Sequence, residues 1–511
     1  MLINPGYESN HELYKHKSLK TVHRDSPPVA LLYLGSYLSE NGYDIDIVDT
    51  HLEDDYVELI REKIKANNYI FVGITVFIGR FLKNAGEITR LINNVKISLP
   101  VVWGGIMPSI MPEACLREYR PDFIVRFEGE KICLELAKAI ENKVGIADIN
   151  GISYLKGDQI INNPASHPVQ NLDDLPIPKW ELFGQYFNNE QLPYYFQIMS
   201  SKGCPFNCKF CYKHSVDVAV RSEISPWRCR SAQHIIKEIE YIHQKTGARV
   251  FTFGDDNFLI NKTRVLEILD YFRLQGFYIE ECIGHINCLN DELINAMAGI
   301  VQTFIFSVET ASSRLQKYID KQVDLVSVPA KARKLYEKGI VSNISFIIGL
   351  PTEINEDLRA NIDFMIKLKG IGPFIRGNSY FFLPLPKTRL YDVVEKLYDV
   401  KLPISMVDFE DANFWVKDIE DPVGKKFRPW LSDEQFQFLV HYGLVFNDVF
   451  KANNSKINET TRDILGSNHK IRKMFRGVES ISHPKTDYRP YILDRLLRGA
   501  PINLVADLRD K

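Results

Sequence analysis

Residues 201–212 read SKGCPFNCKFCY, and they place Cys204, Cys208 and Cys211 within one short loop. Three thiolates at the spacing C-x3-C-x2-C can bind a single inorganic centre, and thiolate ligands select zinc, copper(I) or iron–sulfur. A closed tetrahedral zinc site needs a fourth ligand, which His214 is near enough in the sequence to supply. The other interpretation is an iron–sulfur cluster with three irons held by cysteine and the fourth open to a substrate or cofactor.

The loop follows a predicted strand at 195–200, and short apolar strands then alternate with helical patterns. Catalytic sites of strand–helix barrels lie at the carboxyl ends of the strands, so this position favours the iron–sulfur interpretation. The five further predicted strands are 250–254, 278–284, 303–307, 343–348 and 377–383. Six strand–helix steps without a closing pair predict a partial (β/α)6 barrel of the TIM type.

The preceding part of the chain alternates in the same way. Predicted strands at 2–4, 44–49, 69–75, 101–103 and 123–126 alternate with helices at 29–40, 56–65, 81–95, 112–119 and 129–141. This spacing is typical of a doubly wound parallel sheet of the Rossmann type, whose ligands bind beyond the carboxyl ends of the strands. We therefore predict an α/β fold of four parts: a sheet domain (1–145), a hairpin and linker (146–190), the barrel (191–395) and a mainly helical C-terminal region (396–511).

Composition excludes several classes of protein. The 511 residues include 63 Lys and Arg against 65 Asp and Glu, which provides no general attraction for nucleic acid or anionic membranes. The apolar runs are too short to span a bilayer, and the N-terminus shows no signal peptide. Eight cysteines in this length do not indicate a disulfide scaffold, so we expect a cytoplasmic protein whose thiols are free for metal binding.

The stretch Cys204-Pro-Phe-Asn-Cys208-Lys-Phe-Cys211 resembles the signature of the radical S-adenosylmethionine (SAM) enzymes. The resemblance implies that the three cysteines hold a [4Fe–4S] cluster whose open iron binds SAM. One electron then cleaves SAM to a 5′-deoxyadenosyl radical that abstracts hydrogen from the substrate, so an electron donor such as flavodoxin or ferredoxin is expected. Phe210 matches the aromatic position that packs near the adenine.

Three stretches at the ends of later strands resemble weaker motifs of that family. Gly254 and Asp255 follow the second barrel strand, where the resemblance implies contacts to the SAM ammonium; the alternative is a turn with an Asp helix cap. Glu309 ends the fourth strand and matches a carboxylate that accepts the ribose hydroxyls. Residues 347–353 resemble the stretch that contacts adenine, although a glycine-containing turn is an equal alternative.

The first domain resembles the cobalamin-binding subfamily of radical SAM enzymes. Thr75 after the third strand and Gly104 with Gly105 after the fourth match positions that line the groove for the nucleotide tail, and Ser26 begins another matching segment. Paired glycines let the backbone approach a bulky ligand closely. The family's cobalt-ligating histidine has no counterpart after the first strand. His51 follows the second strand, and we interpret it as a loop histidine, which implies a cobalt without a histidine ligand or a domain that has lost its cofactor.

These features predict a cobalamin-dependent radical SAM enzyme, most simply a methyltransferase that acts on an unactivated carbon of a small molecule or natural product. A radical cyclase, rearrangement or oxidation enzyme, with or without cobalamin, is the alternative within the family. A zinc-stabilised binding protein that uses the three cysteines and His214 is the alternative from another class. The aromatic and basic residues of the C-terminal region, including Trp415, Trp430 and the stretch 469–497, are candidates for closing the site.

Overall fold

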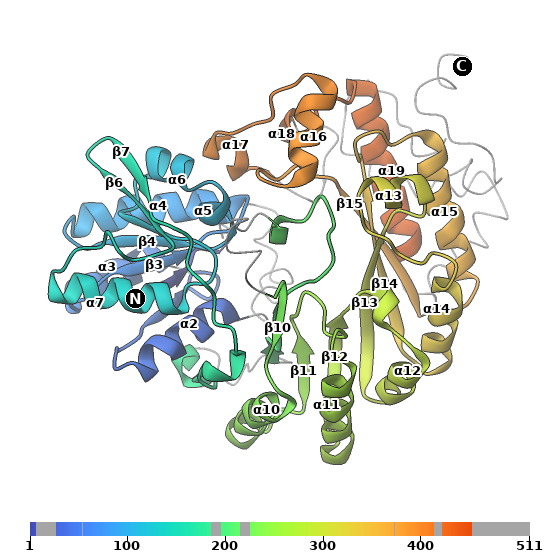
Figure 1. The fold of residues 1–511 in the computed structure, drawn as a ribbon, viewed down its shortest axis with the longest axis horizontal. Coiled ribbons are helices and arrows are strands. Elements are labelled where there is room, and N and C mark those ends of the chain that lie inside the picture. The colour runs from blue at the N-terminus through green and yellow to red at the C-terminus, as the bar shows by residue number, and fades with distance from the viewer. Residues whose placement is uncertain are drawn as a thin grey trace.

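The fold consists mainly of two sheets side by side, one mixed and one parallel, each covered by its own helices (Figure 1). The computed structural model describes residues 1–6, 27–53, 55–184, 196–214, 225–372, 374–412 and 422–451. Ser26, Trp415 and the stretch 469–497 lie outside these ranges, as does the beginning of the strand predicted at 195–200.

The first sheet has seven strands in the order β2-β1-β3-β4-β5-β6-β7. Its strands are β1 (Leu2–Asn4), β2 (Ile47–Asp49), β3 (Val72–Thr75), β4 (Val101–Gly104), β5 (Phe123–Val125), β6 (Ile152–Lys156) and β7 (Gln159–Asn162). The first five are parallel, and the hairpin β6–β7 continues the sheet antiparallel from β5. The strand order reverses between β1 and β3, which is where ligands bind in open sheets of this kind.

Helices cover both faces of this sheet, as the alternation of its sequence predicts. The helices are α2 (Val29–Glu40), α3 (Tyr56–Ala66), α4 (Arg80–Val95), α5 (Ile106–Ile110), α6 (Pro112–Tyr119) and α7 (Glu130–Asn142). One core joins apolar residues of α3, α4, α5 and α6, and a second core joins those of α2 and α7. Two cores on opposite faces confirm the doubly wound arrangement.

The second sheet has six parallel strands in the order β15-β14-β13-β12-β11-β8, so it is an unclosed barrel. Its strands are β8 (Phe196–Ile198), β11 (Val250–Phe253), β12 (Tyr278–Ile283), β13 (Val301–Glu309), β14 (Val341–Ile348) and β15 (Ile375–Phe381). Its helices are α10 (Ala232–Thr246), α11 (Lys262–Gln275), α12 (Asp291–Met297), α13 (Ser313–Tyr318), α14 (Val328–Glu337) and α15 (Asn355–Lys369). All six predicted strands are confirmed.

Short 3-10 turns connect these elements. They are η2 (Leu172–Asp174) and η3 (Trp180–Phe183) in the linker, η4 (Tyr212–His214) after the cysteines and η5 (Ile286–Cys288) after β12. The linker packs against the body of the protein, because Trp180 and Phe183 belong to the core of the barrel. This packing agrees with the apolar residues that accompany its prolines.

The C-terminal region connects both domains. It begins within α16 (Arg389–Tyr398), which crosses the boundary predicted at 395, and contains α17 (Met406–Glu410), α18 (Pro422–Lys426) and α19 (Asp433–Lys451). The orange helices α16–α18 lie across the top of the space between the sheets in Figure 1. α17 packs on α4 and α6, where the Met406 N–H donates to Glu118 at 2.9 Å, whereas α19 packs on β15. Among the described residues, no helix is long and apolar enough to cross a membrane.

Candidate functional site

The loop that carries the three cysteines begins at a two-stranded ribbon beyond the carboxyl end of β8. β9 (Ser201–Gly203) pairs antiparallel with β10 (Trp227–Cys229), so the chain leaves the barrel sheet just before Cys204. Gly203 has a φ of +83°, and a Cβ at this position would lie 2.2 Å from the Pro226 carbonyl oxygen. Glycine is therefore required for the tight crossing that directs the chain into the loop.

Backbone hydrogen bonds and one ring stack hold the loop against the barrel. The Lys209 N–H donates to the Ile319 carbonyl at 2.9 Å, and the Leu390 N–H donates to the Lys209 carbonyl at 3.0 Å. Phe206 stacks on His285 with ring centroids 3.8 Å apart and an interplanar angle of 9°. Burial lowers the pKa of His285 to about 4, so this ring is neutral and stacks without a charge to solvate.

The three cysteines are free thiols on one short segment, which is the donor set that an iron–sulfur cluster needs. Burial raises the pKa of the Cys208 thiol to about 12, and Lys321 beside it acts in the opposite direction. Burial also raises the pKa of Cys204 and Cys211. Thiols of this kind are deprotonated when they coordinate a metal centre. The chemistry of the three donors therefore fits the cluster.

The geometry does not favour a single zinc ion. The side chains of Cys204, Cys208 and Cys211 are described, whereas that of His214 lies outside the described part of the structure. Among the described side chains, no group of three or more His, Cys, Asp or Glu could hold one metal ion. A cluster of four irons places each thiolate on a different iron, so its cysteines lie farther apart than ligands of one zinc ion. The arrangement of the three cysteine side chains therefore does not support the zinc alternative.

Glu309 ends β13 in a backbone conformation that residues with a side chain rarely adopt. Its φ is +65°, and the pairing of β13 with β14 shifts register between Ser307 and Glu309. Its carboxylate, which is buried, lies 3.5 Å from the Lys321 ammonium. Burial raises the pKa of Glu309, and Lys321 opposes that shift. Strain of this sort persists at sites where the fold must aim a particular side chain.

The two aspartates after β11 have different surroundings. Asp255 is 1% exposed and accepts hydrogen bonds from the hydroxyls of Ser200, at 2.9 Å, and Ser201. Burial raises its pKa, and the Arg264 guanidinium opposes the shift. Asp256 instead pairs with Lys213 at 2.9 Å and lines a cavity. Asp255 therefore supports the segment that leads into the cysteine loop, whereas Asp256 faces open space.

At the carboxyl ends of the strands of the first sheet, Thr75 and Gly104 are the paired last residues of β3 and β4. Gly105 follows with a φ of +97°, and a Cβ there would lie 2.7 Å from the Val76 carbonyl oxygen. Ser109, which the sequence-based predictions missed, donates from its hydroxyl to the Gly105 carbonyl at 2.6 Å. Contacts with the neighbouring backbone thus require glycine at position 105. The turn also lines a cavity that a ligand could enter.

A cavity of about 490 Å³ joins the two domains. Thr75, Gly104 and Gly105 line it from the first domain, and Cys204 and Asp256 line it from the barrel. The cavity also extends between α2 and the face of the first sheet, where its wall is largely apolar. The wall residues there include Leu2, Val29, Leu31, Phe71, Gly73, Val102 and Val125. A groove of this shape can accept a long ligand whose tail enters the first domain.

Four charged side chains form the boundary between the domains in this cavity, and sequence reasoning did not predict their pairing. Arg228 donates to Glu128, and Lys202 lies 2.5 Å from Glu130; all four residues line the cavity. Glu130 is buried, and although burial would raise its pKa, the charge of Lys202 holds the pKa below its usual value. The pairs join the loop after β5 and the start of α7 to the β9–β10 ribbon.

The remaining predicted residues do not line this cavity. Cys208, Cys211, Phe210, Gly254 and Glu309 lie outside its wall, and Phe210 packs against an apolar cluster between α13 and α16. His51 also lies outside it; its Nδ1 is 3.1 Å from Asp49. No histidine is among the described residues that line the cavity, and the interpretation of His51 as a loop histidine stays a prediction.

Two protein families match successive parts of the chain. The B12 binding domain matches residues 16–137, and the Radical SAM superfamily matches residues 198–365. An uncharacterized methyltransferase of Pyrococcus horikoshii is 30% identical over 377 residues, 73% of this chain and 79% of that protein. The anaerobic magnesium-protoporphyrin IX monomethyl ester cyclase of Rubrivivax gelatinosus is 26% identical over 435 residues, 81% of this chain and 72% of that protein.

Solved structures share the fold of both domains. The radical enzyme OxsB, with aqua-cobalamin and SAM bound, superimposes with a TM-score of 0.64 at 16% identity over 97% of this chain and 83% of its own. The radical SAM methyltransferase TsrM of Kitasatospora setae, with cobalamin and a [4Fe-4S] cluster bound, has a TM-score of 0.62 at 17% identity over 78% of this chain and 74% of its own. At these identities the likeness concerns the fold.

Proposed function

The chain belongs to the cobalamin-binding radical SAM enzymes, and on that premise we propose that it methylates an unactivated carbon of a small molecule. The observation that carries this proposal is the cavity of about 490 Å³, whose wall includes the Gly104–Gly105 turn of the first domain and Cys204 of the barrel. Methyl transfer to a substrate activated at a second cofactor requires one enclosed space that both cofactor sites share.

We expect one cofactor to bind on the barrel side of this space and the other on the first-domain side. When bound, the [4Fe–4S] cluster with SAM supplies the radical that removes hydrogen, and cobalamin supplies the methyl group. Cys204, Cys208 and Cys211 would hold the cluster. The turn at Thr75, Gly104 and Gly105 and the apolar groove under α2 would hold the nucleotide tail of cobalamin.

Carboxylates at the ends of two barrel strands, β11 and β13, would hold SAM. Glu309, aimed by its left-handed backbone, would accept the ribose hydroxyls, and Phe210 would pack near the adenine. We assign the ammonium contact to Asp256, because Asp255 is buried against Ser200 and Ser201. Asp256, although paired with Lys213, lines the cavity. Gly254 would support this turn, since a Cβ at this position would lie 2.8 Å from the Met199 sulfur.

The two aspartates provide a test of this assignment. Asp255→Asn should lower the free energy of unfolding by about 2 kcal/mol, because it weakens buried hydrogen bonds to a charged group. Asp256→Asn should change stability by less than about 1 kcal/mol, since its pair with Lys213 is partly exposed. It should weaken SAM binding about tenfold, the effect of about 1.4 kcal/mol. Urea unfolding and equilibrium dialysis with SAM measure both effects; the reverse pattern would contradict the assignment.

Anaerobic reconstitution tests the proposed function directly. Enzyme with iron, sulfide, hydroxocobalamin, SAM and a reductant should form 5′-deoxyadenosine and methylcobalamin, measured by liquid chromatography and visible absorption. Enzyme heated before reconstitution is the control for chemistry in solution. If neither compound forms beyond that control, the proposal is wrong. Corrinoid that copurifies with the protein would be an independent indication, because it needs no knowledge of the substrate.

A radical cyclase is the second candidate, and the cyclase of Rubrivivax gelatinosus favours it through a match that extends over 81% of this chain. Deoxyadenosine formation without methylcobalamin or bound corrinoid would select this candidate. Either reaction needs an electron donor, and we propose a flavodoxin or ferredoxin for this role. A cytoplasmic location, which would keep the eight free cysteines reduced, remains a prediction from cysteine usage.

A further inference from the structure

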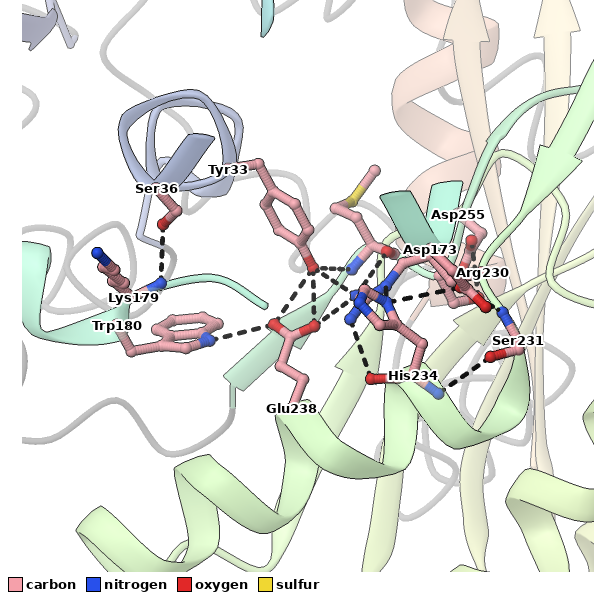
Figure 2. A network of polar contacts seen from close by, with 12 residues as sticks. Tyr33, Ser36, Asp173, Lys179, Trp180, Arg230, Ser231, His234, Glu238 and Asp255 are labelled. Carbon is pink, nitrogen blue, oxygen red and sulfur yellow. Dashed lines mark hydrogen bonds and ion pairs between the residues drawn. The ribbon is translucent and has the colours of Figure 1, made fainter. Parts of the chain in front are cut away.

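A buried polar network lies where three separate segments of the chain meet (Figure 2). Tyr33 comes from α2 of the first domain, Trp180 from the linker, and Arg230 and Glu238 from the start of the barrel. The Arg230 and Glu238 side chains are 4% and 0% exposed and form an ion pair. Charged groups this deeply buried need partners in fixed positions, so the geometry of the network is tightly constrained.

Glu238 accepts hydrogen bonds from all three segments. Its Oε1 accepts from the Trp180 Nε1–H at 3.1 Å, and both carboxylate oxygens lie 3.2 Å from the Tyr33 hydroxyl. Arg230 donates to Oε2. In Figure 2 the carboxylate lies between the tyrosine and tryptophan rings, with the guanidinium on its other side. One side chain of α10 thus connects the first domain, the linker and the barrel.

Tyr33 also bonds to the backbone that leads into the cysteine loop. The Met199 N–H donates to the Tyr33 hydroxyl at 3.1 Å, and Arg230 donates to the same hydroxyl at 3.1 Å and to the Met199 carbonyl at 3.3 Å. Ser200, the next residue, donates to Asp255 and accepts from Arg264. A continuous path of hydrogen bonds therefore runs from α2 to the residues that precede Cys204.

The same residues face the cavity. Tyr33, Met199 and Arg230 are part of its wall, as are Val29 and Ala30 of α2. A shift of α2 against the barrel would therefore change the position of the groove relative to the Cys204 loop. A second link acts in the same place, because the Asp173 carboxylate of the linker accepts from the Ser231 N–H at 2.8 Å.

We propose that Tyr33, Arg230 and Glu238 form an interdomain lock, which sets the position of the first-domain groove relative to the Cys204 loop. Its effect on catalysis rests on the proposed function, since that reaction needs two cofactor sites at a fixed separation. Tyr33 is a positioning residue: its hydroxyl holds the Met199 backbone and the Arg230–Glu238 pair, and its ring lines the cavity without a reactive role.

Tyr33→Phe tests the lock, because it removes the hydroxyl and keeps the ring. Tyr37→Phe is the matched control on the same helix; Tyr37 packs against the apolar cores beside α2 and is not part of the cavity wall. Hydrogen exchange of the whole apo chain should rise about tenfold in both 29–40 and 196–203 for Tyr33→Phe, and should stay at the wild-type rate in 196–203 for Tyr37→Phe. A rise confined to 29–40, or no rise, would overturn the proposal.

A second measurement separates positioning from local structure. In the reconstituted enzyme, the reduced cluster should enhance the electron-spin relaxation of cob(II)alamin, and this enhancement depends on the distance between the two centres. Tyr33→Phe should reduce the enhancement at unchanged iron and cobalt content, and Tyr37→Phe should leave it as in the wild type. Unchanged relaxation in Tyr33→Phe would overturn the lock. If the wild type binds no corrinoid, the proposed function fails, while hydrogen exchange still decides whether the segments are coupled.

Discussion

Replacing Cys208 by alanine is expected to abolish cluster assembly and with it all formation of 5′-deoxyadenosine. Cys208 is the middle cysteine of the loop and the most buried of the three, so no water or external thiol can readily replace its sulfur. Loss of a residue that only hydrogen-bonds to a metal ligand lowers metal affinity or activity roughly 10- to 100-fold. Loss of a direct ligand should have a larger effect. Iron and sulfide analysis of the reconstituted protein, together with chromatography of the SAM products, measures the effect.

Cys288→Ala is the matched control for this substitution. Cys288 is a partly buried thiol whose pKa is raised mainly by burial. Cys204 is close enough to raise this pKa further. It lies outside the C-x3-C-x2-C segment, so the variant should keep the iron and sulfide content of the wild type. A Cys208→Ala protein with a full cluster would show that the loop is not the cluster site. Cluster loss in Cys288→Ala alone would assign the metal centre to different thiols.

The order of strands and helices could be predicted from the sequence because each element carries its own local signal. The helix expected at 29–40 is α2 with the same bounds, and the six barrel strands lie where apolar runs follow helical patterns. Alternating elements of this length form parallel sheets with few alternatives. The short helix α5 was missed, because its sequence IMPSI contains proline and has no polar stripe.

The position of the cysteine loop could likewise be predicted, since strand ends and motif spacing are local properties. The interdomain contacts could not. Arg228 and Glu128 are far apart in the sequence, and neither carries a mark that distinguishes a buried partner from a solvated one. The same holds for Tyr33 and Glu238, which occupy ordinary positions on a largely apolar helix and on an amphipathic one. Such pairs depend on how two completed domains dock, which single-sequence patterns do not encode.

Asp255 and Asp256 show a further limit of a sequence motif. Adjacent residues after a strand point in different directions, and only one of them can face the space beyond the strand end. The sequence offered no reason to prefer one carboxylate, and the resemblance drew attention to the first. The structure places that first carboxylate among the hydroxyls of Ser200 and Ser201. Packing beneath the turn therefore supports the proposed assignment to Asp256, and the contact of either carboxylate with a ligand stays a prediction.

Replacing Gly104 by leucine is expected to prevent corrinoid binding and leave the fold intact. A Cβ at Gly104 would meet only the Val125 carbonyl oxygen, at 3.7 Å, which is an ordinary contact, and Gly104 does not have the left-handed backbone of Gly105. The leucine can therefore fit the protein, with its outer atoms in the cavity that Gly104 lines. Affinity for hydroxocobalamin should fall about 100-fold or more, which corresponds to about 2.7 kcal/mol. Equilibrium dialysis with visible absorption measures it.

Gly145→Leu adds the same side chain where a Cβ meets no atom within 4 Å, outside the cavity wall, and it controls for the general effect of added bulk. The free energy of unfolding of both variants should lie within about 1 kcal/mol of the wild-type value, as is usual for surface substitutions. Both should also assemble the iron–sulfur cluster, because the cysteine loop belongs to the barrel. If Gly104→Leu binds hydroxocobalamin as tightly as Gly145→Leu does, the corrinoid does not approach the Gly104–Gly105 turn, and the groove under α2 cannot be its site. Selective loss in Gly104→Leu, with the cluster retained, would instead assign the two cofactors to opposite walls of one cavity.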